Sequence, residues 1–243
     1  MFDIVVISYG IVIFLLSWFN PIPYGRFCNT VPKFLELPNI LSWIFCNLPV
    51  LIIVGYQLFI VRSRGIGLAV NIFLFIHFFW RAVISQLFIF LIQSTPDEKT
   101  VSIPVFLILG SYNAFVGLAW IQICDGLTSD VTPVDIIFIV GAGVSLLLNA
   151  FYDIFVNYHR NDDNLIISVD GLGFYITEEN LEKYFKLLHV VGITSPNYFF
   201  EMLEWLFMAI LVWERGALLY LISTTLILWV RAYNISLWYH ENK

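Results

Sequence analysis

Long apolar runs, separated by short polar stretches, recur along the whole chain. Each run approaches the length of about 20 mainly apolar residues that an α-helix needs to cross the hydrocarbon core of a bilayer. The pattern therefore predicts an all-α membrane protein, a bundle of about seven transmembrane helices that forms a single domain over residues 1–243. The predicted spans are 3–19, 39–61, 66–93, 102–124, 134–157, 197–213 and 216–239.

The composition agrees with insertion into a lipid bilayer and excludes several other partners. Hydrophobic residues make up 60% of the chain and charged residues 12%, whereas a soluble domain is about half apolar and about a quarter charged. The net charge of −6 leaves no basic face for a nucleic acid. The three cysteines and four histidines show no spacing typical of a metal site. We therefore expect a bilayer, but neither a nucleic acid nor a metal, as a partner.

Basic residues predict which ends of the helices face the cytosol, because cytoplasmic loops of membrane proteins carry an excess of Lys and Arg. With the N-terminus in the lumen, the inner loops and the tail carry seven such residues and the outer loops three. We therefore expect a lumenal N-terminus, a cytosolic C-terminus and a long cytosolic loop over about 158–196. The inner residues are Arg26, Lys33, Lys99, Arg160, Lys183, Lys186 and Lys243, and the outer ones are Arg62, Arg64 and Arg215.

Several ionisable side chains interrupt the apolar spans. Such a group is costly at membrane depth, and it usually faces the interior of a bundle or a water-filled cavity. His77 stands alone in a Phe-rich stretch, which is more typical of a buried core residue than of a catalyst. The charged residues within the spans are Arg81, Asp153, Glu201, Glu204 and Arg231.

Two spans carry the same spacing of a carboxamide and an acid. Asn149 precedes Asp153 by four residues, and Asn197 precedes Glu201 by four; residues at this spacing share a helix face. Acids at the start of the sixth span, with Glu204 one turn on, also suit the positive end of the helix dipole, so an interfacial role is the alternative. The repeated pairing and the two arginines favour a polar cavity inside the bundle that opens to the cytosol.

Motifs that occur in order between residues 23 and 239 resemble the steroid 5α-reductase family, especially its plant and animal ketosteroid members. "TSPNYFFEMLEW" at 194–205 is similar to the family pattern (T/S)-x-P-N-Y-x-x-E-x-x-E-W. "LLLNAFYDIFVNYHR" at 146–160 is similar to its element with Asn, Asp and Arg in register. Shorter resemblances are "PYGRF" at 23–27, "WIFCNLP" at 43–49, "HFFWR" at 77–81 and "RAYNISLWY" at 231–239.

The resemblance implies a membrane-bound, NADPH-dependent reductase of a lipid enone, similar to 3-oxo-5α-steroid 4-dehydrogenase and located in the endoplasmic reticulum. The substrate would be a lipid or a steroid, and the reductase-like portion would cover about 134–243. In the family, the cofactor binds within the bundle and is open to the cytosol. The residues that carry over to cofactor binding are Asn149, Asp153, Arg160, Asn197, Glu201 and Arg231, with Arg81 and Tyr239 as weaker candidates.

The chain departs from the family at the positions that act on the substrate. Asn47 stands where the family has Glu, and Phe78 stands where it has Tyr; in the family these two groups polarise the substrate carbonyl. An Asn side chain can still donate a hydrogen bond, but a Phe side chain cannot. The catalytic residues are therefore unassigned, and the chain is identified as a divergent, C-terminally short member.

Two alternatives to the steroid reductase remain open. A reductase of enoyl-CoA or polyprenol lipids is one, because related families share the C-terminal motif, although "EMLEW" at 201–205 favours the steroid branch. The other is a non-catalytic member that binds a lipid or a nucleotide and has lost the acid. Binding of NADPH with or without turnover of an enone distinguishes an enzyme from this second alternative.

Overall fold

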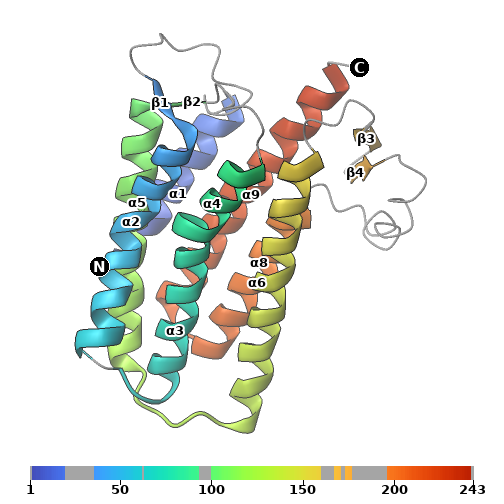
Figure 1. The fold of residues 1–243 in the computed structure, drawn as a ribbon. Coiled ribbons are helices and arrows are strands. Elements are labelled where there is room, and N and C mark those ends of the chain that lie inside the picture. Colours follow the sequence, from blue (N-terminus) through green and yellow to red (C-terminus); the bar gives the residue numbers. More distant parts are fainter. Residues whose placement is uncertain are drawn as a thin grey trace.

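The computed structural model describes residues 2–19, 36–61, 63–92, 100–159, 167–170, 173–176 and 196–241. Seven long helical segments in these ranges follow the seven apolar runs (Figure 1). Six of them are long and apolar enough to cross a membrane. The other, α8 (Pro196–Val212), has 17 residues, which is at the lower end of the spanning length of about 17–25 residues. The predicted class, an all-α membrane protein, is confirmed.

The ends of the helical segments lie within two residues of the predicted spans. The second and third segments are each interrupted by a π-helical turn, η3 (Gln57–Val61) and η4 (Trp80–Ile84). The α-helices of the first five segments are α1 (Phe2–Phe19), α2 (Asn39–Tyr56), α3 (Gly65–Phe79), α4 (Ser85–Ile92), α5 (Ile103–Gly126) and α6 (Pro133–His159). After α8 the chain continues as α9 (Arg215–Glu241).

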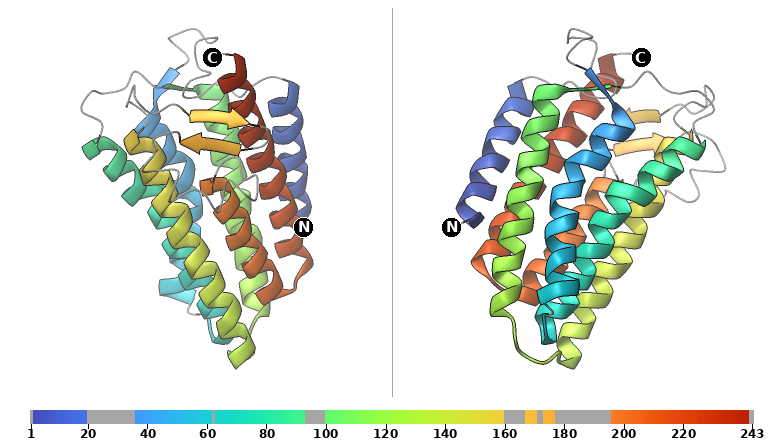
Figure 2. Two further views of the ribbon diagram at one scale, coloured as in Figure 1. Left: turned by 90° about the vertical axis from the view of Figure 1, so that its right-hand side faces the viewer. Right: turned by 60° about the vertical axis from the view of Figure 1, so that its left-hand side comes forward.

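Two short pairs of antiparallel strands lie at the end of the bundle that carries the C-terminus (Figures 1 and 2). The first pairs β1 (Glu36–Pro38) with β2 (Thr100–Ser102). The second pairs β3 (Ile167–Asp170) with β4 (Gly173–Ile176), and β3 contacts α9. The apolar pattern did not predict these strands. The rest of the predicted loop at about 158–196, except for the helix residues at its two ends, lies outside the described residues.

Consecutive segments run in alternating directions (Figure 2). The closest packing is between α6 and α8, between α1 and α9, and between α2 and α5. The third span contacts both α2 and α6, and α6 in turn packs on α8. This arrangement brings polar residues of the third, fifth and sixth spans to one place in the interior.

A glycine fixes how deeply the third span sits against α5. The Gly67 backbone N–H donates to the Leu127 carbonyl oxygen at 3.1 Å. A Cβ at Gly67 would lie 2.6 Å from the Cys124 carbonyl oxygen, closer than van der Waals contact allows. Only glycine permits this approach, so the position of α3 along the bundle depends on it.

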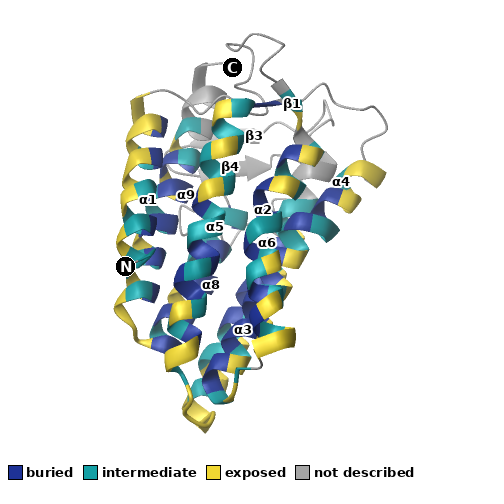
Figure 3. Cartoon of the chain, turned by 90° about the vertical axis from the view of Figure 1, so that its left-hand side faces the viewer, coloured by how far each residue is buried: buried dark blue, intermediate teal, exposed yellow. Residues whose placement is uncertain are grey.

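The distribution of polarity is the reverse of that in a soluble protein. Large apolar side chains such as Leu147, which is 71% exposed, cover the outer faces of the helices (Figure 3). Charged and polar groups lie inside, where Glu204 is 0% and His77 is 1% exposed. Lipid is the natural environment for such an outer surface, and interior polar groups at this depth mark a functional site by default. The protein is therefore an integral, multi-pass membrane protein.

An odd number of spans leaves the two termini on opposite sides of the membrane, and a cytosolic C-terminus stays a prediction. In intact microsomal vesicles, added protease should remove an epitope placed after Lys243 and spare one placed before Met1. Detergent should then expose both epitopes, which controls for intrinsic resistance. Protection of the C-terminal epitope until detergent is added would contradict the basic-residue argument.

Candidate functional site

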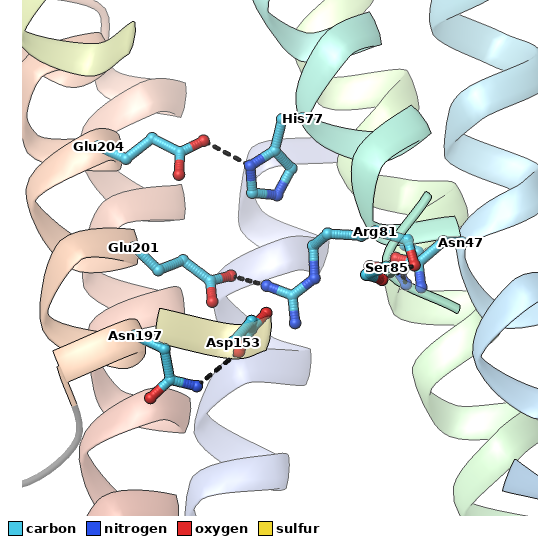
Figure 4. A network of polar contacts seen from close by, with 9 residues as sticks. Asn47, His77, Arg81, Ser85, Asp153, Asn197, Glu201 and Glu204 are labelled. Carbon is cyan, nitrogen blue, oxygen red and sulfur yellow. Dashed lines mark hydrogen bonds and ion pairs between the residues drawn. The ribbon is translucent and has the colours of Figure 1, made fainter. Parts of the chain in front are cut away.

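Two residues of the third span extend their side chains toward α8. His77 lies near the end of α3, and Arg81 lies in η4. The Arg81 Nη1 donates to Glu201 Oε1. The His77 Nδ1 shares a hydrogen bond with Glu204 Oε1 (Figure 4). Both carboxylates are buried in the bundle, with Glu201 6% and Glu204 0% exposed.

The fifth span adds a third contact to this side of α8. The Asn197 Nδ2, in the first turn of α8, donates to Asp153 Oδ1 of α6 at 2.7 Å. The Asp153 carboxylate also lies close enough to the Arg81 guanidinium for electrostatic attraction. Figure 4 shows the three contacts stacked along one face of α8. We call this group the polar ladder; it consists of His77, Arg81, Asp153, Asn197, Glu201 and Glu204.

The π-helical turn helps to direct Arg81 into the ladder. A π turn leaves backbone groups outside the regular hydrogen-bonding pattern of the helix, and such turns are frequent at functional sites. Here the Arg81 carbonyl oxygen accepts a hydrogen bond from Ser85 Oγ at 3.0 Å and one from Gln86 Nε2 at 3.4 Å. Side chains thus satisfy the displaced backbone, and the guanidinium is free to extend to α8.

A second arginine lies near the start of α8. The guanidinium carbon of Arg231, on α9, is 5.1 Å from the ring centre of Tyr198 and 5.9 Å from that of Trp43. These distances are typical of cation–π contacts. Because Tyr198 follows Asn197 directly, Arg231 lies near the Asn197 end of the ladder.

Arg81 is a cation that attracts all three acids of the ladder. Its guanidinium acts on the carboxylates of Glu201 and Asp153, and also on that of Glu204. A charge in a low-dielectric interior is costly unless it is paired. The ladder therefore depends on Arg81.

Asn149 completes the face of α6 that carries Asp153. Its carboxamide lies beside the Glu204 carboxylate, and the residue is 2% exposed. Two buried acceptor atoms in this place, Asn149 Oδ1 and Glu204 Oε2, have no hydrogen-bond partner in the described chain. Buried acceptors of this kind are rare, and they point to a donor-bearing molecule that binds here.

The family model of 3-oxo-5-alpha-steroid 4-dehydrogenase matches residues 111–243 of the chain. The chain belongs to the steroid 5α-reductase family. At the level of the family it is therefore a membrane reductase of the steroid 5α-reductase type. Comparison with individual curated proteins gives no match. The matched range contains every acid of the polar ladder, whereas His77 and Arg81 come from the span before it.

The residues that resemble the cofactor-binding positions of the steroid 5α-reductase family fall into three groups in the structure. Asn149, Arg81 and the other predicted residues of α6 and α8 lie in or beside the polar ladder. Arg231 lies against Tyr198, next to the Asn197 end of the ladder. Arg160 lies outside the described residues, and Tyr239 falls in the part of α9 whose side chains are not described.

Asn47, where the family has Glu, lies apart from the ladder. It is 3% exposed, and Figure 4 shows it on the side of Arg81 away from α8. Both ends of its carboxamide are already engaged. The Asn47 Nδ2 donates to the Trp43 carbonyl oxygen at 2.8 Å, and its Oδ1 accepts from Asn113 Nδ2 at 3.4 Å.

Phe78, where the family has Tyr, belongs to an aromatic wall that borders the ladder. Its ring centre is 4.9 Å from that of His77 and 6.3 Å from that of Trp205. Trp205 also packs edge to face against His77 and Tyr220, each with ring centres 4.7 Å apart. This wall keeps the His77 side of the ladder dry, which strengthens electrostatic interactions there.

Sequence reasoning did not include His77 and Glu204 among the site residues. The sequence does contain a signal for them. His77 and Arg81 are four residues apart in the third span, and Glu201 and Glu204 are three residues apart in the sixth. The lone histidine was interpreted as a core residue, and it is indeed buried, but as part of an ion-pair network. Within the described ranges no group of three His, Cys, Asp or Glu residues could hold a metal.

Proposed function

We propose that the chain is an NADPH-dependent reductase of a lipid enone, with a 3-keto-Δ4 steroid as the leading substrate class. The observation that carries the proposal is the buried polar ladder in a bundle of the steroid 5α-reductase family. An ion-pair network that serves only the fold needs no buried acceptor without a donor. Here Asn149 Oδ1 and Glu204 Oε2 are buried and have no donor among the described residues. The proposed location is the endoplasmic reticulum membrane, with the site open to the cytosol.

The residues of the ladder fit one end of the dinucleotide. The nicotinamide carboxamide and the ribose hydroxyls are donors, and they match the acceptors of Asp153, Asn149 and Glu204. Of these acceptors, Asn149 Oδ1 and Glu204 Oε2 are buried and have no hydrogen-bond partner among the described residues. Glu201 would also accept a hydrogen bond from the dinucleotide while it remains paired with Arg81. Among the described residues Arg231 is the cation placed to meet a phosphate, and Arg160 is a further candidate from the sequence.

When bound, NADPH supplies a hydride to the β-carbon of the enone. The chain's own part is to hold and orient the ring that carries the hydride and to keep water away from it. Asp153 and Asn197 fix each other through their hydrogen bond, so both side chains are preorganised. Preorganised groups of this kind need not reorient during the reaction, which is how they contribute most to the rate.

Exchange of Asp153 for asparagine should weaken NADPH binding. The exchange keeps the size of the side chain but removes the charge that strengthens hydrogen bonds to the cofactor. A charge-assisted hydrogen bond is worth about 1.5–3 kcal/mol, so we expect a loss of roughly tenfold to 150-fold in affinity. Purified protein in nanodiscs, titrated with NADPH and followed by tryptophan fluorescence, measures this loss.

The matched control is Glu214→Gln, which removes an acid from the exposed connection between α8 and α9 and should leave affinity unchanged. An equal effect of both exchanges would show that only the overall charge matters. Absence of NADPH binding by the native protein would contradict the proposal. Tight NADPH binding with no turnover of steroid, enoyl-CoA or polyprenol enones would favour the non-catalytic member instead.

A further inference from the structure

We infer that the buried indole N–H groups of Trp205 and Trp120 donate the hydrogen bonds that polarise the carbonyl oxygen of the enone substrate. The inference rests on the proposed function, because it names the donors for that reaction. Three observations carry it: both N–H groups are buried without an acceptor, the two rings contact each other across the bundle interior, and they lie next to the buried acceptors of the polar ladder.

Two tryptophan donors in the bundle interior lack an acceptor. Trp205 is 1% exposed and Trp120 is 2% exposed, and neither indole Nε1 has a hydrogen-bond partner among the described residues. A buried donor without a partner costs about 1–3 kcal/mol, and such groups are rare. An indole N–H is a donor only, so its role does not depend on the charge of its neighbours. We therefore expect an acceptor from a bound molecule beside these two rings.

The two rings connect the polar ladder with α5. Trp205 follows Glu204 directly on α8, and its ring centre is 4.7 Å from that of His77 and 6.0 Å from that of Trp120. Trp120 comes from α5. Both tryptophan rings also pack edge to face against Tyr220. An aromatic face is only a weak acceptor for an N–H group, so these contacts fix the rings but do not replace an oxygen acceptor.

The unpartnered donors lie next to unpartnered acceptors. Glu204 Oε2 and Asn149 Oδ1 are buried without a donor, and in the proposed function they receive donor groups of the dinucleotide. The enone reacts with the nicotinamide ring of that dinucleotide, so its carbonyl group has to lie close to the same place. Trp205 is the neighbour of Glu204 in the chain, and the Trp120 ring contacts that of Trp205. A carbonyl oxygen has two lone pairs and can accept from both indoles.

The reaction needs a donor that the two family positions do not supply. Phe78 has no donor, and the carboxamide of Asn47 is engaged at both ends. Trp205 packs against Phe78, with ring centres 6.3 Å apart. An indole N–H from Trp205 is thus available beside the place where the hydroxyl of a tyrosine is missing.

Hydrogen bonds to the carbonyl oxygen lower the barrier to hydride addition. Addition of hydride to the β-carbon breaks the C=C π bond, and the electron pair moves through the α-carbon to the carbonyl oxygen, which becomes an enolate oxygen. The two indole N–H groups stabilise the charge that develops there. The α-carbon then takes one proton from solvent and the C=O bond re-forms. The sum of enone, hydride and proton is the saturated ketone, and both indoles are unchanged.

Isotope-edited infrared spectroscopy measures these hydrogen bonds without the need for turnover. The probe is a 3-keto-Δ4 steroid with carbon-13 at the enone carbonyl carbon, bound to the native protein in nanodiscs together with NADP⁺. The label reports the enone carbonyl alone, so a contact with another oxygen of the steroid gives no signal. The carbonyl stretch should lie at lower wavenumber in the native protein than in empty nanodiscs.

Benzothienylalanine is the matched replacement, because it keeps the size and shape of the indole and has sulfur in place of N–H. Introduced by codon suppression in place of Trp205 or of Trp120, it should move the carbonyl stretch back toward its position in empty nanodiscs. Both replacements together should abolish the shift. The control is the same replacement of Trp229, which is 49% exposed on α9 and should leave the stretch unchanged.

Turnover gives the second readout. Loss of one donor at a developing oxyanion costs about 10²–10³ in rate, so we expect that loss when the N–H of Trp205 is removed. The loss should be in kcat more than in KM, because the hydrogen bond strengthens as charge develops on the oxygen. NADPH affinity should change by less than about threefold. A tryptophan that only packs in the wall would show none of these effects, since the replacement keeps its shape.

The outcomes distinguish this inference from the proposed function. Turnover by the native protein with no carbonyl shift overturns the inference and leaves the reductase intact. The full native shift in the protein with both replacements does the same, and it would assign the two N–H groups to buried water. If the native protein binds no enone in any nanodisc preparation, both are wrong. The native spectrum alone gives the first result, so the test does not depend on a variant that folds.

Discussion

Exchange of Arg81 for methionine should destabilise the bundle strongly, because it leaves the Glu201 carboxylate buried without its partner. Removal of one member of a buried ion pair typically costs about 3–5 kcal/mol. Here the neighbouring acids Asp153 and Glu204 would add repulsion, since Arg81 attracts all three acids. Thermal unfolding in nanodiscs, followed by tryptophan fluorescence, measures the loss.

The matched control is the ion pair between Arg215 and Asp3, whose hydrogen bond is 2.7 Å long. The Arg215 side chain is 73% exposed and that of Asp3 is 12% exposed, so the solvated guanidinium screens the pair, and pairs at the surface contribute only about 0–1 kcal/mol. Arg215→Met should therefore have a small effect. A loss in Arg81→Met no larger than in Arg215→Met would mean that the polar ladder does not hold charged groups in a dry interior.

A second exchange separates stability from function at the same contact. Glu201→Leu added to Arg81→Met replaces the ion pair by two apolar side chains, and such replacements are often neutral or stabilising. The double variant should regain much of the lost stability. It should not regain NADPH binding if Glu201 contacts the cofactor as proposed. Full recovery of both properties would assign the contact to the fold alone.

The helices could be predicted from the sequence because lipid imposes one simple requirement on them. Each span must be long and apolar and must satisfy its backbone internally, so the apolar runs marked helix ends to within two residues. The π turns were not predictable in this way. Nothing in the composition of Trp80–Ile84 distinguishes a π turn from an α turn, because the distinction depends on how Ser85 and Gln86 bond to the backbone.

The sequence predicted those features of the candidate site that depend on the spacing of residues within one helix. The four-residue spacing of Asn197 and Glu201 placed both on one face of α8, and the structure shows that this face meets α3, η4 and α6. Which residue pairs with which acid depends on the depth of the third span, and this depth is set by contacts such as that of Gly67 with Leu127. The partnership of His77 with Glu204, 127 residues apart, is therefore a tertiary result.

The double exchange Asn47→Glu with Phe78→Tyr should increase turnover of a 3-keto-Δ4 steroid by about 10²–10³. It restores the two groups that the steroid 5α-reductase family uses at the substrate carbonyl. The Phe78 ring borders the ladder, because its centre lies 4.9 Å from that of the His77 ring. Initial rates of NADPH oxidation in nanodiscs measure the gain.

Each single exchange should give a smaller gain, because groups that act as a unit are not additive. Glu at position 47 gives up the donor that Asn47 directs to the Trp43 carbonyl oxygen, and a buried tyrosine hydroxyl without a partner costs about 1–3 kcal/mol. Both variants should therefore unfold at a lower temperature when no enone is present, and a bound enone should reduce that difference. Native turnover already as fast as that of the double variant would mean that other groups of the native chain polarise the carbonyl. No gain in a double variant that binds NADPH normally would mean that the substrate is not a 3-keto-Δ4 steroid.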